Sequence, residues 1–215
     1  MVSPGFQGER EAVGRVAARR LVVIAASAGG LAPLIDVLAS LRTDFKGAVV
    51  VVQHRSDHTL DMLPSILARR VRLRIALEVD GQVPEAGVIY ICPPGMHMTV
   101  GAVLRVVSAP RLKFVRPSVD LMLKSAAEAY GRGAIGVVLS GSGTDGALGS
   151  GAIVKAGGIV IAQDATAAYR SMPEAAASGG PAQFVLPPRA IGLLLVGLVN
   201  QAEGEGLRAG ASGAN

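Results

Sequence analysis

Four short segments of the chain are apolar at nearly every position: residues 21–26, 48–53, 135–140 and 158–163. Unbroken apolar runs of this length are typical of strands that are buried on both faces of a parallel sheet. Polar residues or glycines follow each run. We therefore predict four core strands that end in tight turns.

Five other segments repeat apolar residues at helical spacing: residues 31–41, 59–70, 119–130, 147–155 and 189–199. Pro64 predicts a kink in the second helix, and Ser118 is placed to cap the start of the third. The repeated order of strand, turn and helix predicts a doubly wound α/β fold with a mainly parallel sheet and helices on both faces.

The middle of the chain has a different rhythm. Residues 72–79, 88–92 and 98–107 have the pattern of strands without a long helix between them, which predicts an antiparallel excursion or hairpin at one sheet edge. Residues 1–20 are expected to be a flexible segment, residues 21–200 a single domain, and residues 201–215, rich in Gly, Ala, Glu and Ser, a disordered tail.

The amino-acid composition argues against several classes of protein. The 215 residues are 50% hydrophobic and 17% charged, which excludes disorder for most of the chain. Only 3% are aromatic, so a base-stacking surface and nucleic-acid binding are not expected. The apolar segment 190–199 is about half as long as a membrane-spanning helix needs to be, so no membrane insertion is expected. The single cysteine, Cys92, fits a reducing compartment, and we expect the cytoplasm.

The net charge of +5 includes a local cluster of Arg69, Arg70, Arg72 and Arg74. Such a cluster is typical of a surface that meets an acidic partner, and equally of a face that is only solvated. The sequence leaves both interpretations open.

Candidate chemistry lies after the predicted strands, because ligands of open α/β sheets bind beyond the carboxyl ends of the strands. Ser27 follows the first strand, His54 the second, and Asp145 lies in the turn after the third. A hydroxyl nucleophile, an imidazole base and an orienting carboxylate are the groups that acyl transfer needs.

Each of these residues also has a purely structural interpretation. Ser27 is suited to cap a helix, His54 to a structural role after a strand, and Asp145 to a turn. Asp164 follows an apolar run too and is the rival orienting acid. His58 and His97 are weaker candidates for the base because of where they fall in the chain.

Other ligand classes find less support. Residues 25–30 lack the glycine spacing of a dinucleotide site, and no Walker-type sequence is present. Residues 141–143, Gly-Ser-Gly, keep a phosphate- or nucleotide-binding loop open as an alternative. The three histidines are scattered and there is no cysteine pair, so we expect no metal.

Five stretches carry a family resemblance: residues 26–30, 52–54, 89–98, 116–120 and 136–147. Through them the chain resembles the catalytic domain of the bacterial chemotaxis protein-glutamate methylesterases, from about Leu21 to about Val199. The resemblance implies a serine hydrolase without a cofactor that demethylates glutamyl methyl esters on the cytoplasmic helices of chemoreceptors. Glutamine deamidation is a second candidate reaction.

The same resemblance assigns roles to residues. It implies Ser27 as the nucleophile, His54 as the base and Asp145 as the orienting acid, with the backbone N–H groups of Ala28 and Ser142 as oxyanion candidates. The chain departs from the family at Ala28, where Thr is common, at Ser142, where Met is typical, and at Thr144, where Asn is usual.

Members of the family also carry a receiver domain ahead of the catalytic one, and about 20 residues are too few for a domain. We therefore expect either an enzyme that is unregulated or controlled by a separate response regulator, or a fragment of a longer protein. The changes at Ala28 and Ser142 keep a second function open, a receptor-binding or signalling module that has lost turnover.

Overall fold

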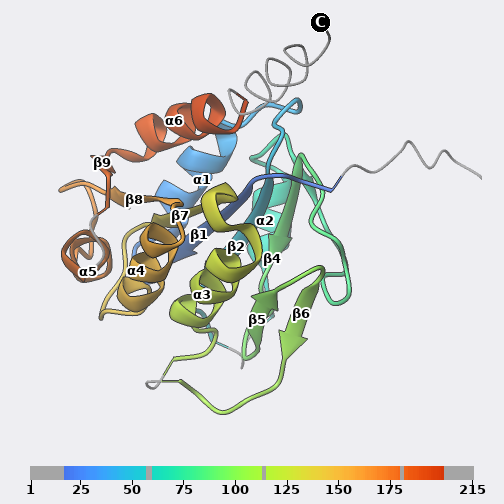
Figure 1. The fold of residues 1–215 in the computed structure, drawn as a ribbon, viewed down its shortest axis with the longest axis horizontal. Coiled ribbons are helices and arrows are strands. Elements are labelled where there is room, and N and C mark those ends of the chain that lie inside the picture. Colours follow the sequence, from blue (N-terminus) through green and yellow to red (C-terminus); the bar gives the residue numbers. More distant parts are fainter. Residues whose placement is uncertain (1–16, 57–59, 113–114, 180–181, 201–215) are drawn as a thin grey trace, which may run out of the picture.

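The structure is a computed structural model that describes residues 17–56, 60–112, 115–179 and 182–200. Seven parallel strands form one sheet in the order β3-β4-β2-β1-β7-β8-β9 (Figure 1). Their bounds are β1 Leu21–Ala26, β2 Ala48–Gln53, β3 Arg74–Ile75, β4 Val88–Ile91, β7 Ala134–Val138, β8 Ile159–Gln163 and β9 Phe184–Leu186.

Helices cover both faces of this sheet. On one face lie α1 (Leu31–Ala39), α2 (Leu63–Ala68) and α6 (Pro188–Asn200), and on the other α3 (Val119–Tyr130), α4 (Ala147–Lys155) and α5 (Ser171–Gly179). A short 3-10 helix, Gly131–Gly133, leads from α3 into β7. Successive residues of a strand point to opposite faces, so Val22 and Val23 enter different hydrophobic cores. The predicted doubly wound fold is confirmed.

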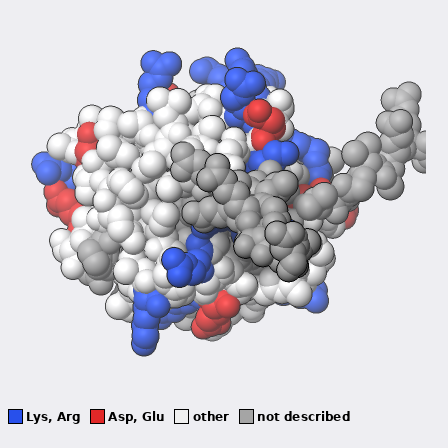
Figure 2. Space-filling view, turned by 45° about the horizontal axis from the view of Figure 1, so that its top comes forward, with Lys and Arg blue, Asp and Glu red and all other residues white. Residues whose placement is uncertain are grey.

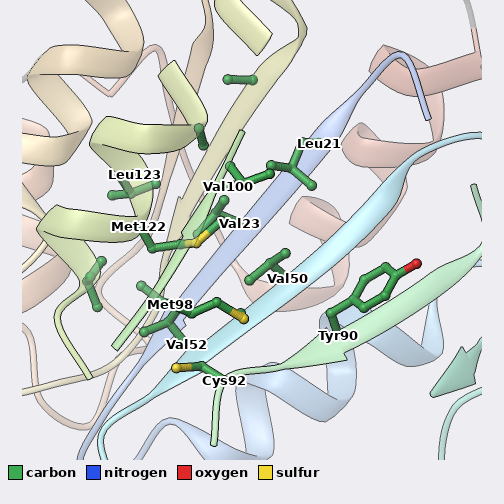
Figure 3. Close-up of a cluster of buried hydrophobic side chains, with 14 of the residues drawn as sticks. Leu21, Val23, Val50, Val52, Tyr90, Cys92, Met98, Val100, Met122 and Leu123 are labelled. Atoms are coloured by element: carbon green, nitrogen blue, oxygen red, sulfur yellow. The ribbon is translucent and has the colours of Figure 1, made fainter. Parts of the chain in front are cut away.

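A separate antiparallel hairpin, β5 (His97–Val100) and β6 (Leu104–Val107), adds to the core under α3. Figure 3 shows Met98 and Val100 of the hairpin and Met122 and Leu123 of α3 in one cluster with side chains of the sheet. All four side chains are buried. The hairpin therefore covers part of this sheet face beside α3.

The middle of the chain differs in part from the sequence prediction. The predicted hairpin exists within residues 97–107, whereas β3 and β4 join the main sheet as parallel strands. The link between them contains no helix, which is why the pattern resembled that of antiparallel neighbours. The sequence pattern also missed α5 and β9, because α5 is rich in Ala, Ser and Gly and β9 is a short, largely exposed edge strand.

The starts of α2 and α3 test the predictions made for Pro64 and Ser118. Pro64 does not kink a helix as predicted, because α2 begins at Leu63 and Pro64 is its second residue. Proline lacks only an N–H that has no partner inside a helix at that position. Ser118 does cap α3, with its side chain accepting a hydrogen bond from the N–H of Leu121. The prediction for Ser118 is confirmed.

The ends of the chain are described only in part. Ala17 pairs with Glu85 in an isolated antiparallel bridge, and Ala18 is buried in the core. Of the segment that we expected to be flexible, these residues are therefore packed against the domain. Residues 1–16 and the predicted tail 201–215 lie outside the described residues.

The connections that follow two neighbouring strands, β1 and β7, run in opposite directions along the sheet. Strand β1 lies between β2 and β7, and the chain continues from β1 toward β2 but from β7 toward β8. Loops that leave neighbouring strands in opposite directions open a crevice at their carboxyl ends, which is where ligands bind in such sheets. Ser27 and the loop 141–146 lie at this point.

Candidate active site

Main-chain hydrogen bonds hold Ser27 and His54 at the same edge of the sheet. The N–H of Ser27 donates to the carbonyl of Ser140, and the N–H of His54 donates to the carbonyl of Ala26, both at 3.0 Å. These bonds continue the ladders of β1 with β7 and with β2. The positions of the serine and the histidine therefore follow from the register of the sheet.

The turn after Ser27 needs its two glycines. Gly29 has φ +68°, and a Cβ on Gly30 would lie 2.8 Å from the Cβ of Ala26 and 2.9 Å from the carbonyl oxygen of Ser140. A larger residue at either position would push the start of α1 away from the sheet. The glycines let the chain reverse directly beside Ser27.

Ser27, His54 and Asp145 form a hydrogen-bonded chain. The Oγ of Ser27 lies 3.2 Å from Nδ1 of His54, and Nε2 of His54 lies 2.9 Å from Oδ2 of Asp145. An ionised carboxylate only accepts hydrogen bonds, so Nε2 carries the proton and Nδ1 of the neutral ring offers its lone pair to the serine. This is the arrangement in which an imidazole takes a proton from a hydroxyl.

Asp145 is held by the first turn of α3. Its Oδ2 accepts from the N–H of Val119 at 2.7 Å, and its Oδ1 accepts from the N–H of Asp120 at 2.9 Å and from the hydroxyl of Ser118 at 3.3 Å. Burial alone raises the pKa of the Asp145 carboxyl, but the hydrogen bonds from His54, Asp120 and Val119 outweigh it, and the pKa lies below its usual value. The carboxylate stays charged beside His54.

His97, a weaker candidate for the base, is hydrogen-bonded to Ser118 at the start of α3. It is fully buried, its Nδ1 accepts from the N–H of Ser118 at 3.1 Å, and its Nε2 donates to the carbonyl of Pro110 at 3.0 Å. Both ring nitrogens are therefore used within the fold. His58 lies outside the described residues.

Asp164, the rival to Asp145, has a local role instead. Its Oδ1 accepts from the N–H of Thr166 at 3.1 Å and from the hydroxyl of the same residue. This is the geometry of an aspartate that closes its own turn. His54 is hydrogen-bonded to Asp145, so the structure brings Asp145 and not Asp164 to the imidazole.

Sequence reasoning missed the support beneath the serine turn. Ser140 is fully buried; its hydroxyl donates to the carbonyl of Ala28 at 2.8 Å and accepts from the N–H of Tyr169 at 3.0 Å. Its own N–H donates to the side chain of Gln163 at 2.9 Å. The available signal was that two otherwise apolar strand segments each end in a polar residue, Ser140 and Gln163.

The two oxyanion candidates flank Ser27. Ala28 follows it directly, and Ser142 follows Gly141, where a Cβ would lie 2.8 Å from the Cβ of Ser27. Within the described part of the chain, no hydrogen bond occupies the backbone N–H of Ala28 or of Ser142. Neither N–H group is therefore committed to another partner among the described residues.

The thiol of Cys92 is not part of the hydrogen-bonded chain of Ser27, His54 and Asp145. Burial raises the pKa of the Cys92 thiol to about 12, so the thiol stays protonated and is a weak nucleophile. Among residues 17–56, 60–112, 115–179 and 182–200, no three His, Cys, Asp or Glu side chains gather as metal ligands.

Comparison with known proteins adds independent findings. The profile of the CheB methylesterase family matches residues 22–195. The chain belongs to this family. It is 41% identical over 194 residues to protein-glutamate methylesterase/protein-glutamine glutaminase 2 of Anaeromyxobacter dehalogenans, covering 87% of this chain and 57% of that protein. It is 39% identical over 189 residues to protein-glutamate methylesterase/protein-glutamine glutaminase 1 of Cupriavidus pinatubonensis, covering 86% and 55%.

A solved structure of the CheB methylesterase family shows the same architecture. The fold matches the Thermotoga maritima CheB methylesterase catalytic domain with a TM-score of 0.79 and 32% identity, over 86% of this chain and 100% of that one. The chain spans about half the length of the curated relatives it matches. The matched half is the catalytic domain.

The predicted arginine cluster lies on the surface. Arg69, Arg70, Arg72 and Arg74 are all exposed, and Arg74 is paired with Glu85 at 2.8 Å. Figure 2 shows the basic side chains of the face in view at several separate places.

No helix in the described part of the chain has the length and apolar character to cross a membrane. The apolar segment 190–199 lies in α6, which packs Ile191 and Leu195 into the core.

Proposed function

We propose that this chain is a serine hydrolase that removes methyl groups from glutamyl methyl esters on the cytoplasmic helices of bacterial chemoreceptors. The observation that carries the proposal is the hydrogen-bonded chain of Ser27, His54 and Asp145 at the carboxyl ends of β1, β2 and β7. Family membership supports the choice of substrate, because the curated relatives are named as protein-glutamate methylesterases.

The first half of the reaction forms an acyl-enzyme. The Oγ of Ser27 attacks the ester carbonyl while Nδ1 of His54 takes its proton, and Asp145 stabilises the resulting imidazolium through Nε2. The negative charge on the carbonyl oxygen is met by the N–H groups of Ala28 and Ser142. Nδ1 then returns the proton to the methoxy group, and methanol leaves as the C–O bond breaks.

The second half restores the enzyme. A water molecule attacks the acyl-enzyme, gives its proton to Nδ1 of His54, and the ester bond to Ser27 breaks as its Oγ takes the proton back. The receptor residue is left as glutamate. With a glutamine side chain the same steps release ammonia instead of methanol, which makes deamidation the second reaction of this site.

No cofactor enters these steps. We place the reaction in the cytoplasm, consistent with a single buried cysteine. A separate response-regulator protein is the candidate for control.

The decisive experiment measures methanol release from methylated chemoreceptor by the wild type and by Ser27→Ala. We expect release by the wild type, none above background by Ser27→Ala, and the same melting temperature for both. Methanol release by a folded Ser27→Ala protein would contradict the proposal. Receptor binding without release by the wild type would support the alternative of a module that has lost turnover.

A further inference from the structure

Two helices of the domain cap each other across the active site. Asp145, the residue before the N-cap of α4, accepts hydrogen bonds from the first turn of α3. In return Asp120, the second residue of α3, accepts from the N–H groups of Gly146 and Gly149 at the start of α4, both at 2.9 Å to Oδ1. Each carboxylate thus satisfies N–H groups that have no partner within their own helix.

Glycines allow the two helix starts to approach closely. A Cβ on Gly149 would lie 2.6 Å from the Cβ of Leu123 and 3.1 Å from the Cα of Asp120, and a Cβ on Gly146 would lie 2.9 Å from Val119. Gly146 also has φ +105°, which other residues rarely adopt. The contact between α3 and α4 is therefore built around the N–H groups that Asp120 binds.

We propose that Asp120 is a positioning residue for catalysis. This proposal rests on the proposed hydrolase function. Asp120 fixes Gly146, and Gly146 is bonded directly to Asp145. Asp120 also donates its own N–H to Oδ1 of Asp145. The Asp120 side chain therefore holds the backbone next to Asp145, and through Asp145 it sets the plane of the His54 ring, whereas the N–H of Asp120 is a backbone contact that a substitution retains.

The need for a fixed position follows from the chemistry. His54 takes a proton from Ser27 only while Nδ1 faces Oγ, and among the described residues Asp145 is the hydrogen-bond partner on the other side of the ring. A displacement of about 1 Å in such a chain costs on the order of 100-fold in rate. A residue that acts only on stability would change the melting temperature without changing the turnover of the folded protein.

The test uses hydrolysis of p-nitrophenyl acetate by the whole chain, with Ser27→Ala as the blank. For Asp120→Ala we expect kcat to fall about 10- to 100-fold with KM unchanged. For Asp120→Asn, which keeps an acceptor oxygen for Gly146 and Gly149, we expect kcat within about threefold of the wild type. Glu128→Ala, which removes an exposed carboxylate from the same helix, is the matched control and leaves kcat unchanged.

A second readout reports the ring directly. We expect the proton NMR signal of the His54 Nε2–H in the wild type and Asp120→Asn, and its loss or broadening in folded Asp120→Ala. Wild-type kcat and an unchanged signal in folded Asp120→Ala overturn the proposal. Asp120→Asn that is folded but as slow as Asp120→Ala also overturns it, since charge and not position would then matter.

If Asp120→Ala does not fold, Asp120→Glu replaces it. This variant keeps the charge and the acceptors but moves them by one methylene, so we expect a lower kcat at unchanged KM, and wild-type kcat overturns the proposal. Failure of the proposed function is recognised separately, because the wild type would then hydrolyse the ester no faster than Ser27→Ala.

Discussion

Asp145 uses both of its oxygens, and this decides what can replace it. Oδ2 accepts from His54 and Val119, and Oδ1 accepts from Asp120 and Ser118. An asparagine has one accepting oxygen, so its amide would meet an N–H group on one side. Oδ1 of Asp120 accepts from both Gly146 and Gly149.

We therefore expect Asp145→Asn to impair both activity and stability. Its kcat should fall on the order of 10³- to 10⁴-fold, as for the loss of an orienting carboxylate. Its free energy of unfolding should fall by about 1–3 kcal/mol, because a buried donor loses its acceptor. Ester hydrolysis and urea denaturation measure the two effects, and a variant with wild-type stability would contradict the double role of Asp145.

The protonation of His54 gives a further prediction at the same scale. Neutral His54 should carry its proton on Nε2 and not on Nδ1, because Asp145 faces Nε2. Nitrogen-15 chemical shifts of the labelled ring at about pH 8 distinguish the two tautomers. A proton on Nδ1 in the neutral ring would exclude the proposed base.

At the scale of elements, the turn from β1 to α1 determines where Ser27 lies. A Cβ on Gly30 would lie 2.9 Å from the carbonyl oxygen of Ser140 and 3.0 Å from the backbone nitrogen of Ser27. The buried hydroxyl of Ser140 ties this turn to the segment before α5 through Ala28 and Tyr169. Elements far apart in sequence thus share the support of one residue.

Gly30→Ala should displace this turn. We expect a loss of about 1–3 kcal/mol in the free energy of unfolding, because backbone atoms must move to admit the Cβ, and kcat lower by at least about 10-fold. Gly197→Ala is the matched control, since a Cβ there meets nothing within 4 Å on α6. Thermal unfolding and ester hydrolysis are measured for both, and equal behaviour would refute the role of the turn.

Ser140→Ala tests the buried hydroxyl. The variant leaves the carbonyl of Ala28 and the N–H of Tyr169 without this partner, so we expect a loss of about 1–3 kcal/mol in stability. Ser65→Ala, an exposed serine of α2, should change stability by less than about 0.5 kcal/mol. Urea denaturation compares the two, and an equal effect would show that the hydroxyl of Ser140 contributes nothing.

For the whole molecule, the same carboxylate links the active site to acid stability. The pKa of Asp145 lies below its ordinary value of 3.8. A group with a lowered folded-state pKa contributes stability that is present above its ordinary pKa and is lost as the pH falls through the folded-state pKa. The contribution of Asp145 is therefore complete near neutral pH and decreases progressively as the pH falls below about 4.

We accordingly expect the melting temperature of the wild type to exceed that of Asp145→Asn near neutral pH, with the difference shrinking below about pH 4. Calorimetry of both proteins between about pH 3 and pH 7 measures it. Asp36→Asn, a change at an exposed carboxylate of α1, is the control. A constant difference across the range would mean that the charge of Asp145 adds no stability.

The sequence by itself determined which segments are buried. The bounds of β1, β2, α3 and α4 match their predictions because burial on two faces or along one stripe leaves a regular apolar pattern. It also determined the chemical types at the strand ends, Ser27, His54 and Asp145, since parallel strands place their carboxyl ends at one edge. Segment α5 and strand β9 escaped because weakly apolar or exposed elements leave little pattern.

Only the tertiary structure decided which of these residues meet. The place of β1 between β2 and β7 brings the turns that carry Ser27, His54 and Asp145 to one edge, where His54 lies between the other two. The first turn of α3 binds Asp145, whereas Asp164 closes its own turn. Strand order, ring orientation and the exchange of caps by Asp120 and Asp145 arise from contacts between residues distant in sequence. A pattern of apolar positions specifies that a residue is buried, but not which neighbour buries it.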